Sequence, residues 1–265
     1  MAAEPMIALM YHDVVPAGRP EASGFNDPWA DHYKFDESAF QAHLAAIESL
    51  AGRGAIGLLT GPRAEGGRSP VLLTFDDGGV SAHAPVAAWL EARGWRGYFF
   101  VTTDYTGKPA FLDEAQIADL HRRGHVIGSH SCSHPTRMAA CSREQLRTEW
   151  RESVRRLSAI IGAPVTTASV PGGYYSRAVA ETAAEAGIRH LFNSEPTTAT
   201  EVVDGCLVIG RFALVRGMPP SLAAGLAAGQ SWPRWRQAGE WKLKKAVKTV
   251  AGPVYVKVAG ILRGR

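Results

Sequence analysis

Short apolar runs alternate along the chain with longer segments whose apolar residues recur every three or four positions. The runs are typical of buried strands, and the recurring segments are typical of amphipathic helices. Their alternation predicts repeated βα units, and hence a barrel-like α/β domain with its site on loops after the carboxyl ends of the strands. The predicted strands cover residues 7–11, 71–75, 98–101, 126–128, 167–170, 190–193 and 207–209.

Several helix ends can be identified from capping residues. Ser142 stands three residues before Gln145, which is the spacing of a capping box, and apolar residues follow at helical spacing as far as Ile161. Each predicted helix lies between two predicted strands, as a barrel of βα units requires. The other helices are predicted to begin after Asp36, Asp113 and Ser176, the last two ending at Gly124 and Gly187.

The sequence TFDDGG follows the strand predicted at 71–75 and contains two adjacent carboxylates. Neighbouring side chains of a strand point to opposite faces, so Asp76 and Asp77 can reach one centre only where the chain turns. Gly78 and Gly79 would allow that turn. Two ionised carboxylates at one centre repel each other, and a divalent cation would remove the repulsion by neutralising one of them.

The sequence GSHSCSH begins at the end of another predicted strand. Its histidines, His130 and His134, are four residues apart, so one helical turn would place both imidazoles on one face. With Asp77 they would form the three-ligand set typical of catalytic zinc, and Asp76 would stay free as a base for water. Cys132 is expected to point away and pack. Alone, Asp-Asp-Gly is typical of a plain turn and HxxxH of surface histidines, but together at two strand ends they favour a metal site.

These motifs resemble those of the polysaccharide deacetylases (NodB-homology domain, carbohydrate esterase family 4). TFDDG at 74–78 and SHxxxH at 129–134 stand intact, and LMYHDVV at 9–15 and GHVIG at 124–128 are similar to other parts of that family. The resemblance extends over about residues 6–215. It implies a distorted (β/α)7 barrel and metal-dependent hydrolysis of an N- or O-acetyl group on a sugar.

The resemblance also implies roles for individual residues. Asp76 would be the general base that deprotonates the attacking water. The metal would be Zn²⁺, with Co²⁺ or Ni²⁺ as alternatives, because the ligand set suits several divalent ions. Its ligands would be Asp77, His130 and His134.

The third motif of the family, R-x-P-Y-G, is altered in this chain. Ser169 replaces the arginine that orients the catalytic aspartate in the family. The backbone N–H of Gly172 could still bind the oxyanion, with Tyr174 beside the substrate. The alternative is that this segment is a plain glycine turn with packed aromatic rings.

The fifth motif, L-x-I-H, has Gly210 in place of the histidine that acts as general acid. His12, at the end of the first predicted strand, is the best substitute, and Asp13 is expected to orient it. The alternative is a structural histidine bonded to a loop carbonyl. Glu195 is predicted to pair with Arg211 and so rebuild the lost support, and the alternative is a solvent-exposed loop pair.

The net charge of +4 is unevenly distributed. Residues 233–265 carry nine Lys or Arg against Glu240 alone, so this tail is +8 and residues 1–232 are −4, which argues against nucleic acid as a partner of the main body. We therefore divide the chain into a catalytic barrel, 1–232, and a basic amphipathic tail. Apolar residues from Leu243 to Val250 recur at helical spacing among lysines, which favours an anionic membrane surface or packing on the barrel.

The chain shows no apolar stretch long enough to cross a bilayer and no secretory signal at its start. Its three cysteines contain no CxxC pair, which is typical of a reducing compartment. These observations predict a cytoplasmic protein, at the inner face of the membrane if the tail binds there.

The sequence therefore predicts a metal-dependent hydrolase that removes an N-acetyl group from a sugar of a surface polysaccharide or glycolipid precursor. Two alternatives remain open at this point. One is an O-deacetylase or deformylase at the same metal. The other is a glycan-binding homologue without activity, because three supporting positions of the family have changed.

Overall fold

A computed structural model of the protein describes residues 5–60 and 69–250. Its centre is a curled sheet of nine strands in the order β11-β1-β4-β5-β6-β7-β8-β10-β9, in which only the β10–β9 pair is antiparallel. The strands are β1 (Ala8–Tyr11), β4 (Leu72–Phe75), β5 (Tyr98–Val101), β6 (Val126–Ser129), β7 (Thr167–Ser169), β8 (His190–Phe192), β9 (Thr200–Val203), β10 (Cys206–Ile209) and β11 (Phe212–Ala213).

All seven predicted strands are present, each within one residue of its predicted ends. The predicted α/β barrel is thus confirmed. Four strands were not predicted: β9, β11 and a separate parallel pair, β2 (Val14–Val15) and β3 (Phe35–Asp36).

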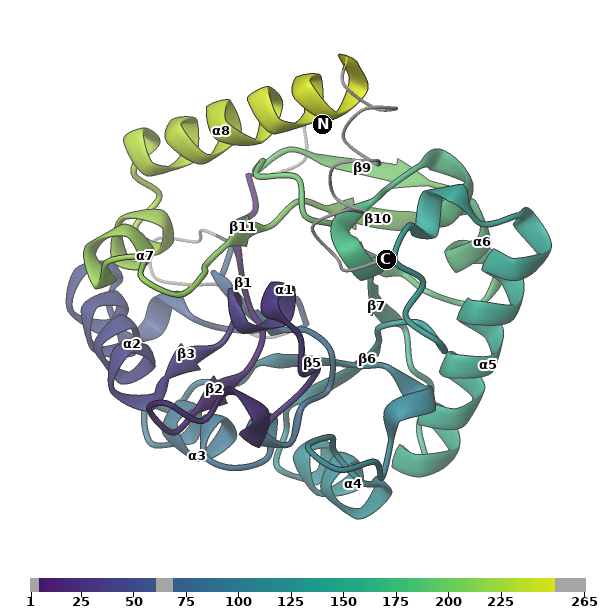
Figure 1. Ribbon diagram of the computed structural model, residues 1–265, viewed down its shortest axis with the longest axis horizontal. Helices are drawn as coiled ribbons and strands as arrows, with labels where there is room; N and C mark the ends of the chain where they lie inside the picture. The colour runs from purple at the N-terminus through teal and green to yellow at the C-terminus, as the bar shows by residue number, and fades with distance from the viewer. Residues whose placement is uncertain (1–4, 61–68, 251–265) are drawn as a thin grey trace.

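Helices surround the curled sheet, and the short helix α1 (Pro28–Asp31) lies over its centre (Figure 1). The predicted capping box forms at Ser142, and the predicted cap Asp113 forms one as well. Ser176 and Asp36 precede their helices without a side-chain cap bond. The outer helices are α2 (Glu37–Ala51), α3 (Val86–Glu91), α4 (Glu114–Arg122), α5 (Arg143–Ile161), α6 (Arg177–Glu185) and α7 (Pro220–Ala227).

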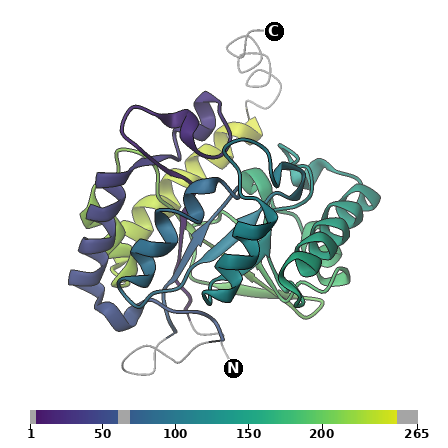
Figure 2. The ribbon, with the colours of Figure 1, turned by 90° about the horizontal axis from the view of Figure 1, so that it is seen from below.

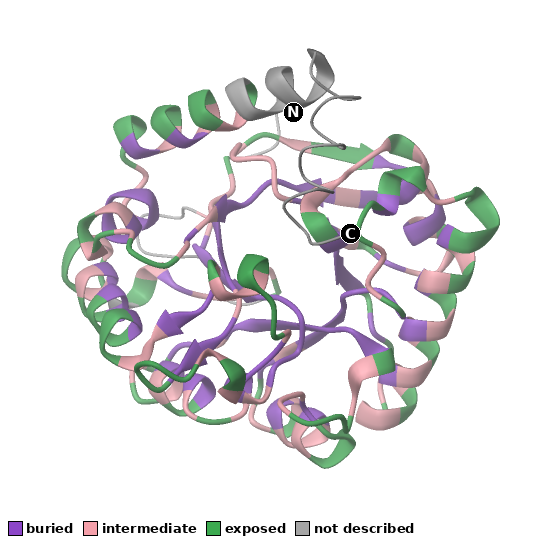
Figure 3. Ribbon diagram, viewed as in Figure 1, coloured by how far each residue is buried: buried purple, intermediate pink, exposed green. Residues whose placement is uncertain are grey.

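Apart from β9, the strands are largely buried on both faces, and the helices expose their outer sides (Figure 3). The inner face of the sheet carries its own apolar cluster, made of Ala8, Leu72, Tyr98, Phe100, Phe192 and Ile209. Because side chains alternate along a strand, the inward positions continue toward the carboxyl ends two residues at a time. From Leu72 they reach Asp76, and from Ile209 they reach Arg211.

The sheet does not close into a complete ring of hydrogen-bonded strands. Strand β10 pairs with β8 and β9, whereas β11 pairs with β1, and only Gly210 and Arg211 connect β10 to β11. This connection, which we call the seam, carries Arg211 into the interior, where its side chain is fully buried.

The last described helix, α8 (Ser231–Val250), lies along the outside of the barrel next to α7, as Figures 1 and 2 show. Pro233 and Gln237 are buried, and the Gln237 side-chain amide donates to the carbonyl of Ala213 at 2.9 Å. The helix begins at Ser231, two residues before the predicted start of the tail at residue 233. The division into barrel and tail stays a prediction. The side chains of residues 243–250, where the apolar spacing of the tail was predicted, and residues 251–265 lie outside the described part. In the described ranges no helix is both long and apolar enough to span a bilayer.

Candidate active site

The turn after β4 brings the two adjacent carboxylates together, as predicted. Asp77 and Gly78 have left-handed backbones, with φ of 75° and 83°, so the chain leaves the extended conformation directly after the strand. Gly79 has an ordinary φ of −63° and serves a different purpose. A Cβ there would lie 1.9 Å from Oδ1 of Asp13, so this glycine leaves room for a buried carboxylate.

The two histidines come from an irregular loop after β6, so the predicted helical turn is wrong. Ser131 and His134 have left-handed φ values of 65° and 60°. The loop is held by the carboxylate of Glu149 on α5, which accepts hydrogen bonds from the backbone N–H groups of Cys132 and Ser133, each at 2.8 Å. The two left-handed residues and the Glu149 carboxylate, rather than a helical turn, therefore place the two histidines.

Asp77, His130 and His134 converge on one point. The Nε2 atoms of the two histidines lie 3.4 and 3.5 Å from Oδ1 of Asp77, and one ligand atom from each residue lies within 4.8 Å of the others. Ligands of a tetrahedral zinc ion are about 3.3 Å apart, so the set fits a divalent cation almost unchanged. Cys132, as expected, points elsewhere: its Sγ lies 3.2 Å from Oδ1 of Asp104.

Asp76 is held by Arg211 in a bidentate pair buried beside the converging ligands. Nη1 and Nη2 of Arg211 donate to Oδ1 and Oδ2 of Asp76, each at 2.7 Å, and Nε donates to the carbonyl of Asn193 at 3.0 Å. The predicted pairing of Arg211 with Glu195 is therefore wrong. Glu195 donates its backbone N–H to the side chain of Asn193 at 2.9 Å, and the support for the base comes from the seam.

The charges around the two aspartates keep both ionised. Burial by itself would raise the pKa of Asp76, but the Arg211 guanidinium outweighs it and holds that pKa below its ordinary value. Burial likewise opposes ionisation of Asp77, but hydrogen bonds from His130 and His134 hold its pKa well below the usual range. Each carboxylate thus has its own cationic or hydrogen-bonding partners, which removes the repulsion expected between neighbours.

His12 lies at the same end of the barrel, half-buried, with its ring 4.4 Å from that of Tyr33. Its Nδ1 atom is buried and has no hydrogen-bond partner among the described residues. Burial lowers the pKa of His12, and the nearby charges of Asp77 and Asp76 partly oppose that shift. The imidazole is therefore close to both carboxylates and is neutral at neutral pH.

Asp13 does not orient His12, so that expectation is wrong. Oδ1 of Asp13 accepts hydrogen bonds from the hydroxyls of Ser23 and Ser81, at 2.6 and 2.8 Å. Burial raises the pKa of Asp13 to about 6. The carboxyl ties the segment that carries α1 to the residues just after the Asp77 turn.

Aromatic rings flank the histidine loop. The Phe25 ring lies 4.9 Å from the His134 ring, 4.6 Å from Tyr105 and 5.0 Å from Phe111. All of these residues are half-buried. Together these aromatic rings form an apolar surface that could face the carbon skeleton of a bound molecule.

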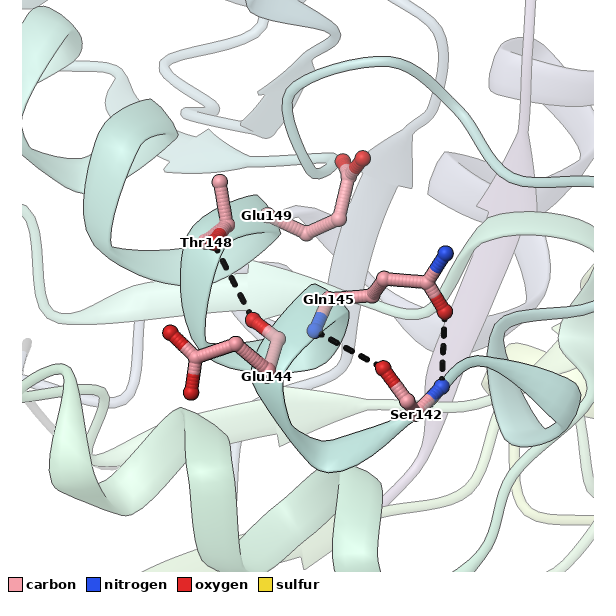
Figure 4. Close-up of a pocket in the computed structure, with 5 residues that line it drawn as sticks. All are labelled: Ser142, Glu144, Gln145, Thr148 and Glu149. Atoms are coloured by element: carbon pink, nitrogen blue, oxygen red, sulfur yellow. Dashed lines mark hydrogen bonds between the residues drawn. The ribbon is translucent and has the colours of Figure 1, made fainter.

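A separate hollow of about 440 Å³ lies at the start of α5 (Figure 4). The view shows the capping-box bonds between Ser142 and Gln145, with the Glu149 carboxylate pointing away from them. Its lining residues are Ser142, Glu144, Gln145, Thr148 and Glu149, so it contains none of the converging ligands.

Comparison with known proteins agrees with this arrangement. Residues 63–191, which include Asp76, Asp77 and the histidine loop, match the family model of polysaccharide deacetylases. Over this region the chain resembles the polysaccharide deacetylases. It is also similar to a chitooligosaccharide deacetylase of Sinorhizobium fredii (strain NBRC 101917 / NGR234), with 32% identity over 133 residues, which cover 49% of this chain and 60% of that protein.

Solved structures of the family share the fold. The Streptococcus pyogenes deacetylase PplD, in complex with acetate, has a TM-score of 0.66 at 19% identity, covering 83% of this chain and 96% of that one. IcaB from Ammonifex degensii has a TM-score of 0.62 at 18% identity, covering 86% and 98%. The predicted NodB-type barrel is confirmed. The chain spans between half and two thirds of the length of the curated relatives that it matches.

The altered fifth motif has a steric cause. A Cβ on Gly210 would lie 2.4 Å from the carbonyl O of Glu195 and 2.5 Å from Cγ2 of Thr197. No side chain fits there without moving that backbone. The seam therefore cannot present a histidine at this position.

The altered third motif lies against the histidine loop. Gly172 has a left-handed φ of 63°, and a Cβ there would lie 2.7 Å from the carbonyl O of Thr136. The Arg137 guanidinium lies 5.5 Å from the centre of the Tyr174 ring. Both predicted substrate-contacting residues thus neighbour the loop that carries His134, and their roles stay predictions.

Sequence reasoning assigned no role to three residues that the structure places at the site: Ser169, Tyr33 and Glu149. Ser169 stands at an inward position at the end of β7, so the alternation along that strand could have indicated it. Tyr33 and Glu149 lie in a loop and on an outer helix, and no local pattern of the sequence points to them.

Proposed function

We propose that the protein hydrolyses the N-acetyl group of a sugar in a surface polysaccharide or glycolipid precursor. The observation that carries this proposal is the convergence of Asp77, His130 and His134 beside the buried, ionised Asp76. The printed name of the chitooligosaccharide deacetylase supports an N-acetylated sugar as the substrate class.

Zn²⁺ is the proposed cofactor, held by Asp77, His130 and His134, with Co²⁺ or Ni²⁺ as functional replacements. A bound cation would polarise the acetyl carbonyl and make water easier to deprotonate. His130 is oriented for this ligation because its Nδ1 lies 3.1 Å from the carbonyl O of Ser169, which keeps Nε2 facing Asp77.

Asp76 is the proposed general base, and the structure supports Oδ2 as the proton-accepting atom. Oδ1 accepts from Arg211 and lies 3.1 Å from the Ser169 hydroxyl, whereas among the described residues Oδ2 accepts from Arg211 only. Oδ2 therefore has the greater remaining capacity to accept the proton of the attacking water. Arg211 acts as a positioning residue for this carboxylate.

His12 is the proposed source of the proton for the departing amine. Its buried, unpartnered Nδ1 and its closeness to the two aspartates support this role. Because burial lowers the pKa of His12, the ring is neutral at rest, and it would have to receive the proton that Asp76 takes from the attacking water before passing it to the amine. The backbone N–H of Gly172 is proposed to bind the oxyanion, with Tyr174 contacting the sugar.

The test is acetate release from N-acetylhexosamine oligomers by the full chain with added Zn²⁺. We expect turnover in the parent and a loss of roughly 1000-fold in Asp76→Asn, which keeps the shape of the side chain but not its basicity. Release from O-acetylated sugars only would indicate an O-deacetylase. Zn²⁺ binding without turnover on any acetylated or formylated substrate would indicate a glycan-binding homologue.

We also propose that α8 binds an anionic membrane surface, where a lipid-linked substrate would be found. Trp232 and Trp235 are each 72% exposed, while Pro233 and Gln237 hold the helix on the barrel. Large exposed aromatic side chains next to basic residues are typical of helices that lie on membranes. The predicted cytoplasmic location remains part of this proposal, supported by three unpaired cysteines.

Vesicle flotation tests the membrane proposal with the full chain. We expect binding to phosphatidylglycerol vesicles, weak binding to phosphatidylcholine vesicles, and loss of binding in Trp232→Ser/Trp235→Ser. Trp29→Ser is the matched control, because Trp29 is 60% exposed but lies on α1. Equal flotation of the double variant and the parent would reject the proposal.

A further inference from the structure

One hydroxyl group touches both parts of the site. Ser169, at the end of β7, is fully buried, and its Oγ lies 2.5 Å from Nδ1 of His130 and 3.1 Å from Oδ1 of Asp76. His130 is a metal ligand of the proposed function, and Asp76 is its base. The two residues otherwise come from different strands, β6 and β4.

The direction of these hydrogen bonds follows from the donors available. When Nε2 of His130 faces Asp77 as a ligand atom, the ring proton is on Nδ1, which then has to donate. Its acceptors are Oγ and the carbonyl O of Ser169, at 2.5 and 3.1 Å. The hydroxyl keeps its own proton, and Oδ1 of Asp76 is the acceptor within reach.

The same hydroxyl selects one oxygen of the base. Oδ1 of Asp76 receives a hydrogen bond from Arg211 and one from Ser169, so its lone pairs are largely used. Within the part of the chain that the structure describes, Oδ2 receives a hydrogen bond from Arg211 alone. A side chain without a hydroxyl at position 169 would make the two oxygens more alike and would release one acceptor of His130.

We propose that Ser169 is a positioning residue that links cation binding to base placement by accepting from His130 and donating to Asp76. The inference rests on the proposed function. It adds that the ligand tautomer of His130 and the orientation of Asp76 are fixed together, through a residue that touches neither the cation nor the substrate.

The experiment measures Zn²⁺ affinity by competition with a chromophoric chelator, and turnover of an N-acetylhexosamine oligomer. We expect Ser169→Ala to weaken Zn²⁺ binding by about 10- to 100-fold, the usual loss when the hydrogen-bond partner of a ligating histidine is removed. At saturating Zn²⁺, kcat should still fall while KM changes little, because Asp76 has lost a hydrogen bond. Ser169→Thr, which keeps a hydroxyl at this position of the strand, should retain most of the Zn²⁺ affinity and most of kcat.

A matched control separates this role from simple destabilisation. Thr182→Val removes another fully buried hydroxyl, one whose hydrogen bonds go to the carbonyls of Ala178 and Val179 in its own helix. It should leave Zn²⁺ affinity and kcat unchanged. Nitrogen NMR of the imidazoles gives a third measure: the Nδ1-protonated tautomer of His130 should be less populated in Ser169→Ala than in Ser169→Thr.

Each outcome bears on the inference separately from the proposed function. Parental Zn²⁺ affinity and kcat in Ser169→Ala would overturn the inference, even in an active enzyme. A parent that binds Zn²⁺ but releases no acetate would reject the proposed function, while the affinity and tautomer measurements would still decide the role of Ser169. A parent that binds no Zn²⁺ would overturn both.

Discussion

Two halves of the site differ in how the sequence encodes them. The ligand half consists of Asp77, His130 and His134, which come from two short loops, each with left-handed residues in it. The support half consists of Asp76, Ser169 and Arg211, where the hydrogen-bonded pair of Asp76 and Arg211 is separated by 135 positions in the chain.

The difference shows which features of such a site are tied to local sequence. A cation needs lone pairs converging from fixed directions, so the ligand half depends on the exact backbone of its two loops. A carboxylate base needs only hydrogen-bond donors within reach, and a guanidinium can come from any neighbouring strand end. The support half can therefore be rebuilt with other residues at other positions, as it is here by Arg211 and Ser169.

The largest effect should come from the ligand half. Asp77→Asn should weaken Zn²⁺ binding and lower turnover by roughly 1000-fold or more, because one anionic ligand of three is lost. Stability without metal should also fall, by about 1–3 kcal/mol, because Asn loses the charge that the hydrogen bonds of His130 and His134 stabilise in the folded protein. Zn²⁺ titration measures the affinity, acetate release measures the turnover, and urea unfolding of the apo-protein measures the stability. Parental Zn²⁺ affinity would show that the cation is bound elsewhere.

The second prediction removes the guanidinium that holds Asp76 in the support half. Arg211→Met should lower turnover by about 100-fold or more and destabilise the fold by about 3–5 kcal/mol, because it leaves the Asp76 charge buried without its partner. Zn²⁺ affinity should change much less than in Asp77→Asn. Arg211→Lys keeps the charge but not the two-pronged geometry and should fall between the parent and Arg211→Met. Unchanged turnover in Arg211→Met would remove the guanidinium from the support of the base.

The third prediction concerns the proton for the leaving group. His12→Phe should lower turnover of an N-acetyl sugar by about 10²- to 10⁴-fold, the usual contribution of a general acid. Hydrolysis of 4-nitrophenyl acetate should be almost unaffected, because nitrophenolate leaves without a proton. Comparison of the two substrates in the same variant provides the measurement. Equal losses on both would mean that His12 positions the substrate rather than donating a proton.

The smallest effect on turnover should come from Asp13, which supports the Asp77 turn from behind. Its pKa of about 6 in the folded protein is above the unfolded value, so its stabilising effect is complete at low pH and is lost as pH rises through 6. The free energy of unfolding of Asp13→Asn minus that of the parent should therefore grow by about 3 kcal/mol between about pH 4 and pH 7. Urea unfolding across this range measures it, and a difference independent of pH would contradict the shift.

The strands and the ligands could be predicted because each is encoded locally. Seven strands are apolar runs bounded by polar residues, and Asp77, His130 and His134 stand in two motifs at strand ends. Strand β9 was missed because two of its four residues are exposed, so it shows no apolar run. Strand β11 was missed because it has only two residues.

The partners of Asp76 in the support half could not be predicted because they depend on which side of the seam each side chain faces. Arg211 and Glu195 are near each other in the fold, and pairing them by charge was reasonable. The alternation from Ile209 to Arg211 instead directs the guanidinium inward, toward Asp76 and Thr74. The irregular histidine loop was likewise hidden, since a spacing of four residues also suits a helix.

The crowding at Gly210 sets a limit for protein engineering. A designer who wished to place a histidine at position 210 of this barrel could not do so by replacing one residue, because the 195–197 backbone occupies the space that an imidazole would need. That segment would first have to be shortened or rerouted. The reaction chemistry open to this scaffold is thus restricted by the path of a neighbouring loop, and directed evolution from it would have to begin with a deletion.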